Sequence, residues 1–298
     1  MEKINIMVLR HSAFYSPLLT TISGGFLKAE GLEAHYSVAT PERTVPNAIR
    51  NGEVHLAQSA VATSFAELEQ GQTIDIVHFA QINRLDGFFI AGRQPDPGFS
   101  WEQLNGKEIL VDHLFQPLAM FRYALNKLGI DESSVKITDA GSVEAMDRAF
   151  RDGQGDYVHQ QGPFPQQLEK EGLGHVVASV GEIVGPVASS SLCATRDWLK
   201  SDMAKAFMRA YREASHFVLE TSAEEIASLE ASFFPNIDRE VLVQTISTYQ
   251  RMGNWSPDPQ IDQADYDHLL DVYLFSGLIT QRHPYESCAV LPPESGPA

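Results

Sequence analysis

The chain has 298 residues, of which 43% are hydrophobic and 20% are charged, and both fractions are typical of a globular protein with a substantial core. Its 39 Asp and Glu residues outnumber its 22 Lys and Arg residues, which gives a formal net charge of −17. A surface this acidic repels phosphate backbones and anionic lipids, so we expect no nucleic-acid partner and no membrane insertion.

The N-terminal part of the chain alternates short apolar runs with helical patterns, which predicts an α/β unit. Gly24 and Gly25 are weak points inside its first helix, and glycines close the next two helices at Gly52 and Gly71. The predicted strands are 4–9, 32–39, 55–59 and 74–81, and the predicted helices are 16–30, 45–52 and 64–70.

A second α/β unit follows between Phe99 and Gln161. Its predicted strands are 108–112, 135–139 and 156–160, and its predicted helices are 116–128 and 142–150. Strands that alternate with helices favour a parallel sheet, and such sheets bind ligands at the carboxyl ends of their strands. The first and third of these strands end in polar and aromatic residues, at 113–116 and 159–163, which indicates a pocket for a small molecule.

The C-terminal third is predicted to be helical, over 201–218, 222–233, 238–252 and 263–275. Consecutive helices without strands cannot extend a sheet, so they must cover existing faces or pack on one another. Disorder is expected only at the tail, residues 293–298.

Cysteine usage and the N-terminus give further expectations. Cys193 and Cys288 are too few for a disulfide framework and lack the spacing of metal ligands. We therefore predict no metal and no cofactor. The apolar run at the N-terminus is shorter than the core of a signal peptide. The expected location is cytoplasmic as the sequence is written, or periplasmic or surface-tethered if a leader has been removed.

Several landmarks, in order and spacing, resemble the substrate-binding proteins of nitrate, sulfonate, taurine and pyrimidine ABC importers, which are grouped with the thiamine-pyrimidine synthases. The resemblance covers about residues 4–220. Its landmarks are Arg10-His-Ser-Ala-Phe-Tyr-Ser-Pro17, Ala48-Ile-Arg-Asn-Gly-Glu-Val-His-Leu-Ala-Gln-Ser59, Leu104-Asn-Gly-Lys-Glu-Ile-Leu-Val111 and Ala149-Phe-Arg-Asp-Gly-Gln-Gly-Asp-Tyr157.

The resemblance implies an α/β fold of the type 2 periplasmic-binding-protein kind, with two lobes, a mostly parallel sheet in each lobe and a helical C-terminal segment. The first lobe would comprise residues 1–91 plus 190–298, and the second residues 92–189. Small residues at Ala91-Gly92 and Ser189-Ser190 suit hinges at the two crossings. The ligand would lie in the cleft between the lobes.

The same resemblance implies ligand contacts in the loops that follow the strands. Aromatic rings there can stack on a planar ligand, while amides and imidazoles fix its polar edge. The expected ligand is a small polar aromatic or anionic organic molecule, and the expected protein partner is an ABC permease. The predicted ligand-binding residues are His11, Ser12, Phe14, Tyr15, Ser59, Ala60, Ala62, Gln81, Asn83, Arg84, His113, Phe115, Gln116, His159, Gln160 and Gln161.

Other interpretations stay open at this point. Phe14 and Phe115 are equally compatible with core packing, and Arg84 with an ion pair to Asp86. An enzyme on the same scaffold is one alternative, either pyrimidine-synthase-like or desulfinase-like, and a cytoplasmic ligand sensor is another. The sequence lacks the cysteine cluster of the synthases, and no residue is predicted to be catalytic.

Overall fold

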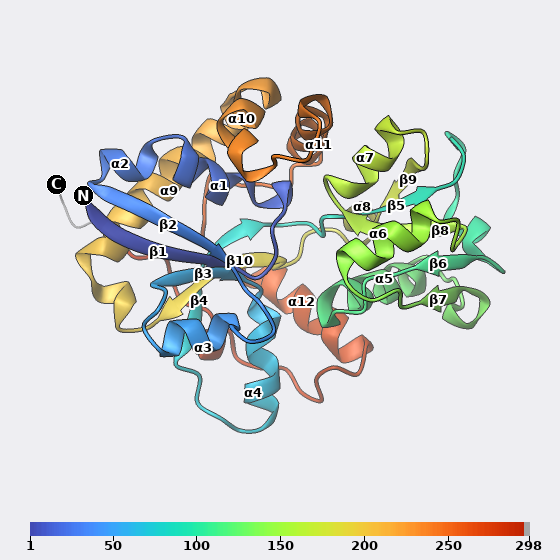
Figure 1. Ribbon diagram of the computed structural model, residues 1–298. Coiled ribbons are helices and arrows are strands. Elements are labelled where there is room, and N and C mark those ends of the chain that lie inside the picture. The colour runs from blue at the N-terminus through green and yellow to red at the C-terminus, as the bar shows by residue number, and fades with distance from the viewer. Residues whose placement is uncertain (295–298) are drawn as a thin grey trace.

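A computed structural model describes residues 1–294, so residues 295–298 of the tail expected to be disordered lie outside the described part. Two α/β lobes lie side by side, and each is built on a sheet of five strands (Figure 1). In sheet order, the first sheet contains β2 (Leu32–Val38), β1 (Glu2–Val8), β3 (Leu56–Ser59), β10 (Ser190–Thr195) and β4 (Ile76–Asn83). The second contains β7 (Lys136–Thr138), β6 (Glu108–Leu110), β8 (Tyr157–Gln161), β5 (Phe88–Gly92) and β9 (His175–Ser179).

One strand in each sheet runs against the others. β1 pairs in parallel with β2 and β3, whereas β10 is antiparallel to both β3 and β4. In the second sheet β6 pairs in parallel with β7 and β8, whereas β5 is antiparallel to both β8 and β9. The prediction of a mostly parallel sheet in each lobe is therefore confirmed.

The helices cover both sheets, and several begin at a capping side chain. Ser142, Ser201 and Asp262 each accept a hydrogen bond from a backbone N–H in the first turn of the helix that follows. The helices are α1 (Ser16–Ser23), α2 (Phe26–Ala29), α3 (Val45–Arg50), α4 (Phe65–Glu69), α5 (Phe115–Lys127), α6 (Val143–Arg151), α7 (Phe164–Lys170), α8 (Val180–Val184), α9 (Asp202–Glu220), α10 (Ala223–Glu230), α11 (Arg239–Arg251), α12 (Gln263–Phe275) and α13 (Tyr285–Cys288).

Two C-terminal helices bridge the lobes, and α11 and α12 lie between them in Figure 1. On α12, Tyr273 packs edge-on against Phe65 of the first lobe, with ring centroids 5.3 Å apart. His268 of the same helix packs against Tyr123 on α5 of the second lobe, at 5.6 Å. The C-terminal helices thus tie the two sheets together as well as covering the first. No helix within residues 1–294 has the length and apolarity needed to cross a membrane.

The chain passes between the sheets twice, from β4 to β5 through residues 84–87 and from β9 to β10 through residues 180–189. The crossing expected at Ala91-Gly92 lies inside β5, which belongs to the second sheet. A division that follows the sheets therefore falls between Asn83 and Phe88, whereas the expected crossing at Ser189-Ser190 coincides with the start of β10. With that shift, we propose the two sheets as the centres of two hinged lobes.

Candidate functional site

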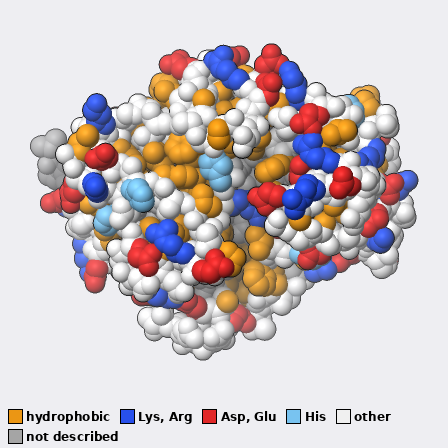
Figure 2. Space-filling view, viewed as in Figure 1, with side chains coloured by type: hydrophobic (Ala, Val, Ile, Leu, Met, Phe, Trp, Pro, Cys, Tyr) orange, Lys and Arg blue, Asp and Glu red, His pale blue; other side chains and the backbone are white. Residues whose placement is uncertain are grey.

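Two adjoining cavities lie between the lobes, at the carboxyl ends of several strands. The small chamber has a volume of about 410 Å³, and the large chamber has a volume of about 860 Å³. Leu9, Arg10, Leu114 and Gln161 line both chambers, so they lie where the two chambers adjoin, a region called the neck below. Figure 2 shows the surface hollowed between the lobes, with hydrophobic side chains on both sides of the hollow.

Both lobes and both crossing segments contribute walls to the small chamber. Tyr15 and Ser59 come from the first lobe, Asp86 from the first crossing, and Phe88 and Gln116 from the second lobe. All except Gln116 are at least nine-tenths buried. A volume of a few hundred cubic ångströms with apolar walls and a few polar groups is typical of a small-molecule site.

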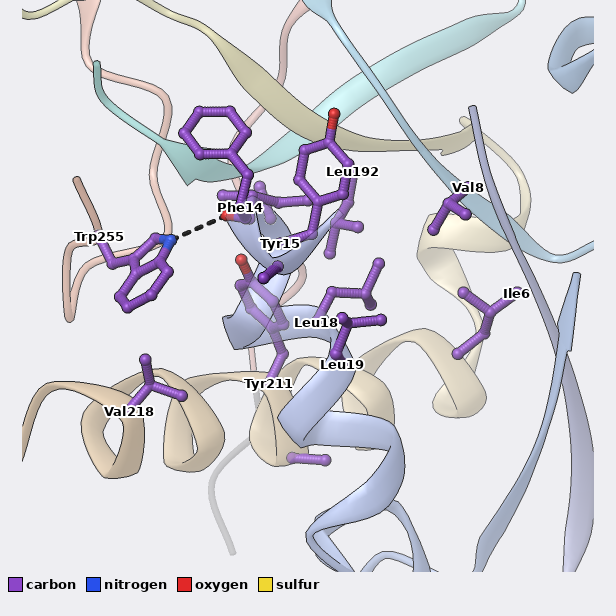
Figure 3. Packing of buried hydrophobic residues seen from close by; sticks show 14 of the residues in the cluster. Ile6, Val8, Phe14, Tyr15, Leu18, Leu19, Leu192, Tyr211, Val218 and Trp255 are labelled. Atoms are coloured by element: carbon purple, nitrogen blue, oxygen red, sulfur yellow. Dashed lines mark hydrogen bonds between the residues drawn. The ribbon is translucent and has the colours of Figure 1, made fainter. Parts of the chain in front are cut away.

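The aromatic wall is positioned by the turn that precedes α1. Ser12 caps this turn, because its hydroxyl accepts a hydrogen bond from the Phe14 N–H. The Phe14 carbonyl accepts from Trp255 Nε1 at 3.0 Å and from Asn83 Nδ2 at 2.7 Å. Figure 3 shows the Phe14 and Tyr15 rings directed away from the α9 residues Tyr211 and Val218. The turn is therefore held by hydrogen bonds from Trp255 and Asn83, while its two aromatic rings face the chamber.

Arg10 and Asp112 form an ion pair across the cleft. Arg10 follows β1, Asp112 follows β6, and Nη1 lies 2.6 Å from Oδ2. The two side chains are only 17% and 7% exposed, so solvent screens this pair less than a surface pair. The Arg10 guanidinium also lies 5.6 Å from the centroid of the Phe88 ring. This pair joins the lobes at the neck of the two chambers.

Gly162, which follows β8, is held by two residues of the first lobe. Ser12 Oγ donates to the Gly162 carbonyl at 2.7 Å, and the Gly162 N–H donates to the Tyr249 hydroxyl at 2.9 Å. Tyr249 in turn donates to the Gly87 carbonyl in the first crossing. At Gly87 a Cβ would lie 2.5 Å from the Phe14 ring, so the crossing needs glycine there. Together these bonds join the two lobes across the cleft.

The small chamber contains an unusually basic carboxylate. The pKa of Asp86 is raised to about 7, mainly by burial and to a smaller extent by nearby Asp112, while the Phe88 N–H and Arg10 act in the opposite direction. Burial also raises the pKa of Tyr15, so its hydroxyl remains protonated at neutral pH.

The structure brings most of the predicted ligand-binding residues to the chambers. Those that line the small chamber are Phe14, Tyr15, Ser59, Ala60, Ala62, Phe115, Gln116 and Gln161, and those that line the large chamber are His11, Ser12, His113 and Gln161. The His11 ring is already engaged, since it lies 2.7 Å from both the Tyr36 hydroxyl and the Phe233 carbonyl. Because a carbonyl only accepts, Nε2 donates to Phe233 and Nδ1 accepts from Tyr36. His11 therefore shapes the wall and has no free nitrogen for a ligand.

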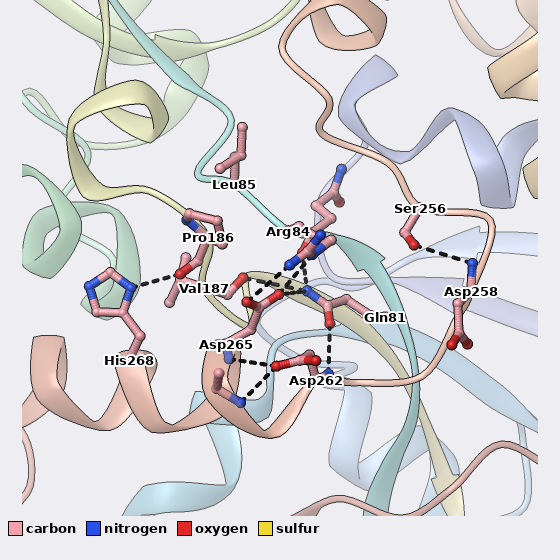
Figure 4. Close-up of polar contacts among 12 residues, drawn as sticks. Gln81, Arg84, Leu85, Pro186, Val187, Ser256, Asp258, Asp262, Asp265 and His268 are labelled. Atoms are coloured by element: carbon pink, nitrogen blue, oxygen red, sulfur yellow. Dashed lines mark hydrogen bonds and ion pairs between the residues drawn. The ribbon is translucent and has the colours of Figure 1, made fainter.

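Five predicted residues, namely Gln81, Asn83, Arg84, His159 and Gln160, line neither chamber. Arg84 lies on the back of the hinge, where Nε pairs with Asp265 Oδ2 at 2.9 Å (Figure 4). The pair to Asp86 that the sequence also allowed is replaced by this contact with α12. Gln81 donates to the Asn83 carbonyl in the same region, and Asn83 supports the Phe14 turn. These three side chains brace the crossing segments.

His159 and Gln160 are buried inside the second lobe. The His159 ring stacks on Phe88 with centroids 4.5 Å apart and lies against Phe121 at 5.4 Å. Burial lowers the pKa of His159 to about 3, so this imidazole is neutral at neutral pH. Gln160 Nε2 donates to Asp147 Oδ1 within the same lobe. Adjacent residues in a strand point to opposite faces, and neither side chain reaches the strand end where the chambers lie.

Sequence reasoning missed the charged residues of the site. Arg10, Asp86 and Asp112 line the chambers, yet none was among the predicted contacts. The available signal was position, because Arg10 directly follows the first predicted strand of one unit and Asp112 is the last residue of the first predicted strand of the other. Their pairing joins residues that are far apart in sequence, so no local pattern reveals it.

The described residues offer little for covalent or metal chemistry. Within residues 1–294 there is no group of three or more His, Cys, Asp or Glu side chains placed to hold a metal ion. Cys193 and Cys288 are buried free thiols, and burial raises their pKa values to about 12 and about 11. Neither thiol lines a chamber. The geometry instead suits enclosure of a molecule by stacking and hydrogen bonding.

Comparisons with known proteins agree with this geometry. The family described as NMT1/THI5 like matches residues 13–225. The chain is 30% identical to "Putative binding protein YtlA" of Bacillus subtilis (strain 168), over 96% of this chain and 86% of the relative. Among solved structures, the ligand-binding component of an ABC-type import system from Staphylococcus aureus is 16% identical with a TM-score of 0.77, covering 98% of this chain and 97% of the other. The alkanesulfonate-binding protein SsuA from Xanthomonas axonopodis pv. citri, bound to MOPS, is 15% identical with a TM-score of 0.74, covering 98% and 99%.

Proposed function

The chain belongs to the NMT1/THI5-like family, and from this membership and the interlobe chambers we propose that it is a solute-binding protein of an ABC importer. The ligand lies in the small chamber and contacts both lobes. It is a small organic molecule with a flat body, which stacks on the aromatic wall, and a polar edge. The observation that carries the proposal is the small chamber itself, because its buried walls come from both sheets and both crossing segments.

The chamber's chemistry supports a flat ligand with a polar edge. Phe14, Tyr15 and Phe88 supply aromatic surface, while the Ser59 hydroxyl and the Gln116 amide supply polar contacts. Phe115 lines the same chamber but is 75% exposed, so it has room to move onto a bound molecule. Enclosure between the lobes removes water and strengthens each polar contact with the ligand.

The partner in this role is an ABC permease, which receives the ligand when the lobes separate. The S. aureus and X. axonopodis proteins are described as import-system and alkanesulfonate-binding components, which supports the same type of role here. Of the two expected locations, the periplasmic or surface-tethered one fits an importer. The enzyme alternatives are not favoured, since within residues 1–294 neither a cysteine nor a lysine lines a chamber.

A blocking substitution tests the location of the ligand. Ala60→Trp places a large ring in the small chamber, so bound molecules that co-purify with the protein should be lost from native mass spectra, and added aromatic probes should no longer raise the melting temperature. Ala29→Trp is the matched control, because Ala29 is exposed on α2 and distant from the cleft. Equal binding by the Ala60→Trp variant and the unmodified protein would contradict the proposal.

A further inference from the structure

Arg10 is the sole lysine or arginine among the described residues that line the two chambers. A protein that binds an anionic ligand normally offers a guanidinium or ammonium group, or several backbone N–H groups, to that charge. Among side chains, any selection for or against an anion in this cleft therefore depends mainly on the Arg10 guanidinium.

Asp112 already engages this guanidinium across the cleft, because its Oδ2 accepts a hydrogen bond from Arg10 Nη1 at 2.6 Å. The carboxylate is itself held in place, since Asp112 Oδ1 accepts a hydrogen bond from the Leu114 N–H at 2.9 Å. The positive charge at the neck of the chambers is thus already neutralised by a group that belongs to the protein.

Within residues 1–294, the remaining charged side chains of the chambers are all acidic. Asp86 lines the small chamber, and Asp139 and Glu144 line the large one. An anionic ligand would have to displace Asp112 from Arg10, or else place another negative charge beside these carboxyl groups, of which Asp86 is only partly ionised at neutral pH. Either outcome disfavours its binding.

Uncompensated hydrogen-bond acceptors point in the same direction. Gln116 Oε1 and Gln161 Oε1 are buried and have no hydrogen-bond partner among the described residues, and both side chains line the small chamber. The Gln116 amide is oriented by its Nε2, which donates to the Ser189 carbonyl at 3.2 Å. Free acceptors match a ligand that carries N–H or O–H donors.

We propose that Asp112 is a specificity-determining residue that excludes anionic ligands by occupying Arg10, so that the small chamber takes uncharged molecules bearing hydrogen-bond donors. The proposal rests on the proposed function, because it concerns the ligand of the same cleft. It distinguishes this chain from its structural neighbour that is described as an alkanesulfonate-binding protein.

Two probes of nearly the same shape isolate the effect of charge. Benzenesulfonamide is uncharged at neutral pH and donates two N–H bonds, whereas benzenesulfonate is an anion with acceptors only. Isothermal titration with the unmodified protein should give at least about tenfold tighter binding of the sulfonamide. Asp112→Asn should raise the affinity for the sulfonate by about tenfold or more and change that for the sulfonamide by less than about threefold, since the Oδ1 of the introduced asparagine keeps the acceptor for the Leu114 N–H.

Asp139→Asn is the matched control, because it removes one carboxylate from the large chamber without touching Arg10, and the Oδ1 of its asparagine keeps the bond from the Gly141 N–H. Its preference between the two probes should equal that of the unmodified protein. A native preference for benzenesulfonate, an unchanged preference in Asp112→Asn, or an equal shift in Asp139→Asn would overturn the role of Asp112 while leaving the proposed function standing. Failure of both probes to bind any of the three proteins would count against both proposals.

Discussion

Arg10 illustrates what a single residue contributes to the cleft. It joins the lobes through Asp112, lies against the Phe88 ring and lines both chambers. Removing either partner of a buried ion pair leaves the other charge without compensation, which usually costs more than the pair itself contributes. The pair is therefore a point at which one substitution changes both closure of the cleft and its charge.

Glu230 is a second buried charge site, and it lies in the core of the first lobe. Its carboxyl group is within 3.0 Å of Ser16 Oγ and 2.8 Å of Thr20 Oγ1. The single Ser16 proton is also within reach of the Ala13 carbonyl, at 2.9 Å. A protonated Glu230 satisfies all these groups, because it donates to Ser16 Oγ and accepts from Thr20. Burial accordingly raises the pKa of Glu230 to about 8.

The raised pKa of Glu230 makes the stability of the fold depend on pH. The folded protein retains the Glu230 proton up to about pH 8, whereas the reference pKa of glutamate is 4.5. The stabilising contribution of the protonated side chain is therefore complete below pH 4.5 and is lost as the pH rises toward 8. Glu230→Gln should remove this loss and raise the free energy of unfolding at pH 8 by on the order of 2 to 5 kcal/mol. Urea unfolding at pH 5 and pH 8 measures the free energy of unfolding of both proteins, and Glu213→Gln, at an exposed glutamate, is the control. A variant that is destabilised at pH 8 would show that the carboxylate is charged in the folded state.

At the level of elements, the approach of the β8–α7 loop to α11 sets how far the lobes can close. A Cβ on Gly162 would lie 2.6 Å from Thr245 Cγ2 and 2.9 Å from the Tyr249 hydroxyl, both on α11. Glycine is therefore required at this contact between the lobes, although its φ angle is not in the left-handed region.

Gly162→Ala should therefore hold the cleft partly open. We expect a larger radius of gyration in small-angle X-ray scattering and a ligand affinity lowered by about tenfold, because the closed state becomes less populated. Gly98→Ala is the control, since its Cβ would meet only an Asp96 side-chain oxygen at 3.7 Å in a loop of the second lobe. If scattering and affinity both stay unchanged in Gly162→Ala, the interlobe contact does not govern closure.

Elements with a clear hydrophobic period or a capping residue were predictable from the sequence. The two antiparallel strands, β5 and β10, were not. The helix predicted over 263–275 matches α12, whose cap at Asp262 is a local signal. The helix predicted over 16–30 divides at Gly24 and Gly25, since Gly25 adopts a φ of 86°. β5 and β10 escaped prediction, because each is a short buried strand adjoining a crossing, and its partners are distant in sequence. β9, α7 and α8 were also missed.

The same distinction holds for the residues of the site, since some are placed by their position after a strand and others by partners far away in the sequence. Residues such as Tyr15, Ser59 and Gln116 follow strands, so the general rule about strand ends brought them to the chambers. Arg84 also follows a strand, and His159 was expected near a strand end, but they are engaged by Asp265 and by Phe88, which lie elsewhere in the sequence. Which strand-end residue faces the ligand depends on these distant partners, and all of the ligand contacts stay predictions.

At the scale of the whole molecule, two sheets are linked by two crossings that are bonded to each other and to α12. The Val187 N–H donates to the Arg84 carbonyl at 2.7 Å, and the Ala188 N–H donates to the Asp265 carbonyl at 3.0 Å. Because α12 also packs against α5 and α4, movement of the lobes must pivot at this cluster. Asp86 and Ser189 of the same two crossings line the small chamber, so this cluster lies beside the site where ligand contacts from both lobes can form together.

The most direct measurement is a crystal structure of the protein with whichever of benzenesulfonamide and benzenesulfonate binds more tightly. We predict electron density for the probe in the small chamber, with contacts to Ser59 or Tyr15 of the first lobe and to Gln116 or Phe88 of the second. Density at another site, or contacts with one lobe alone, would contradict the account.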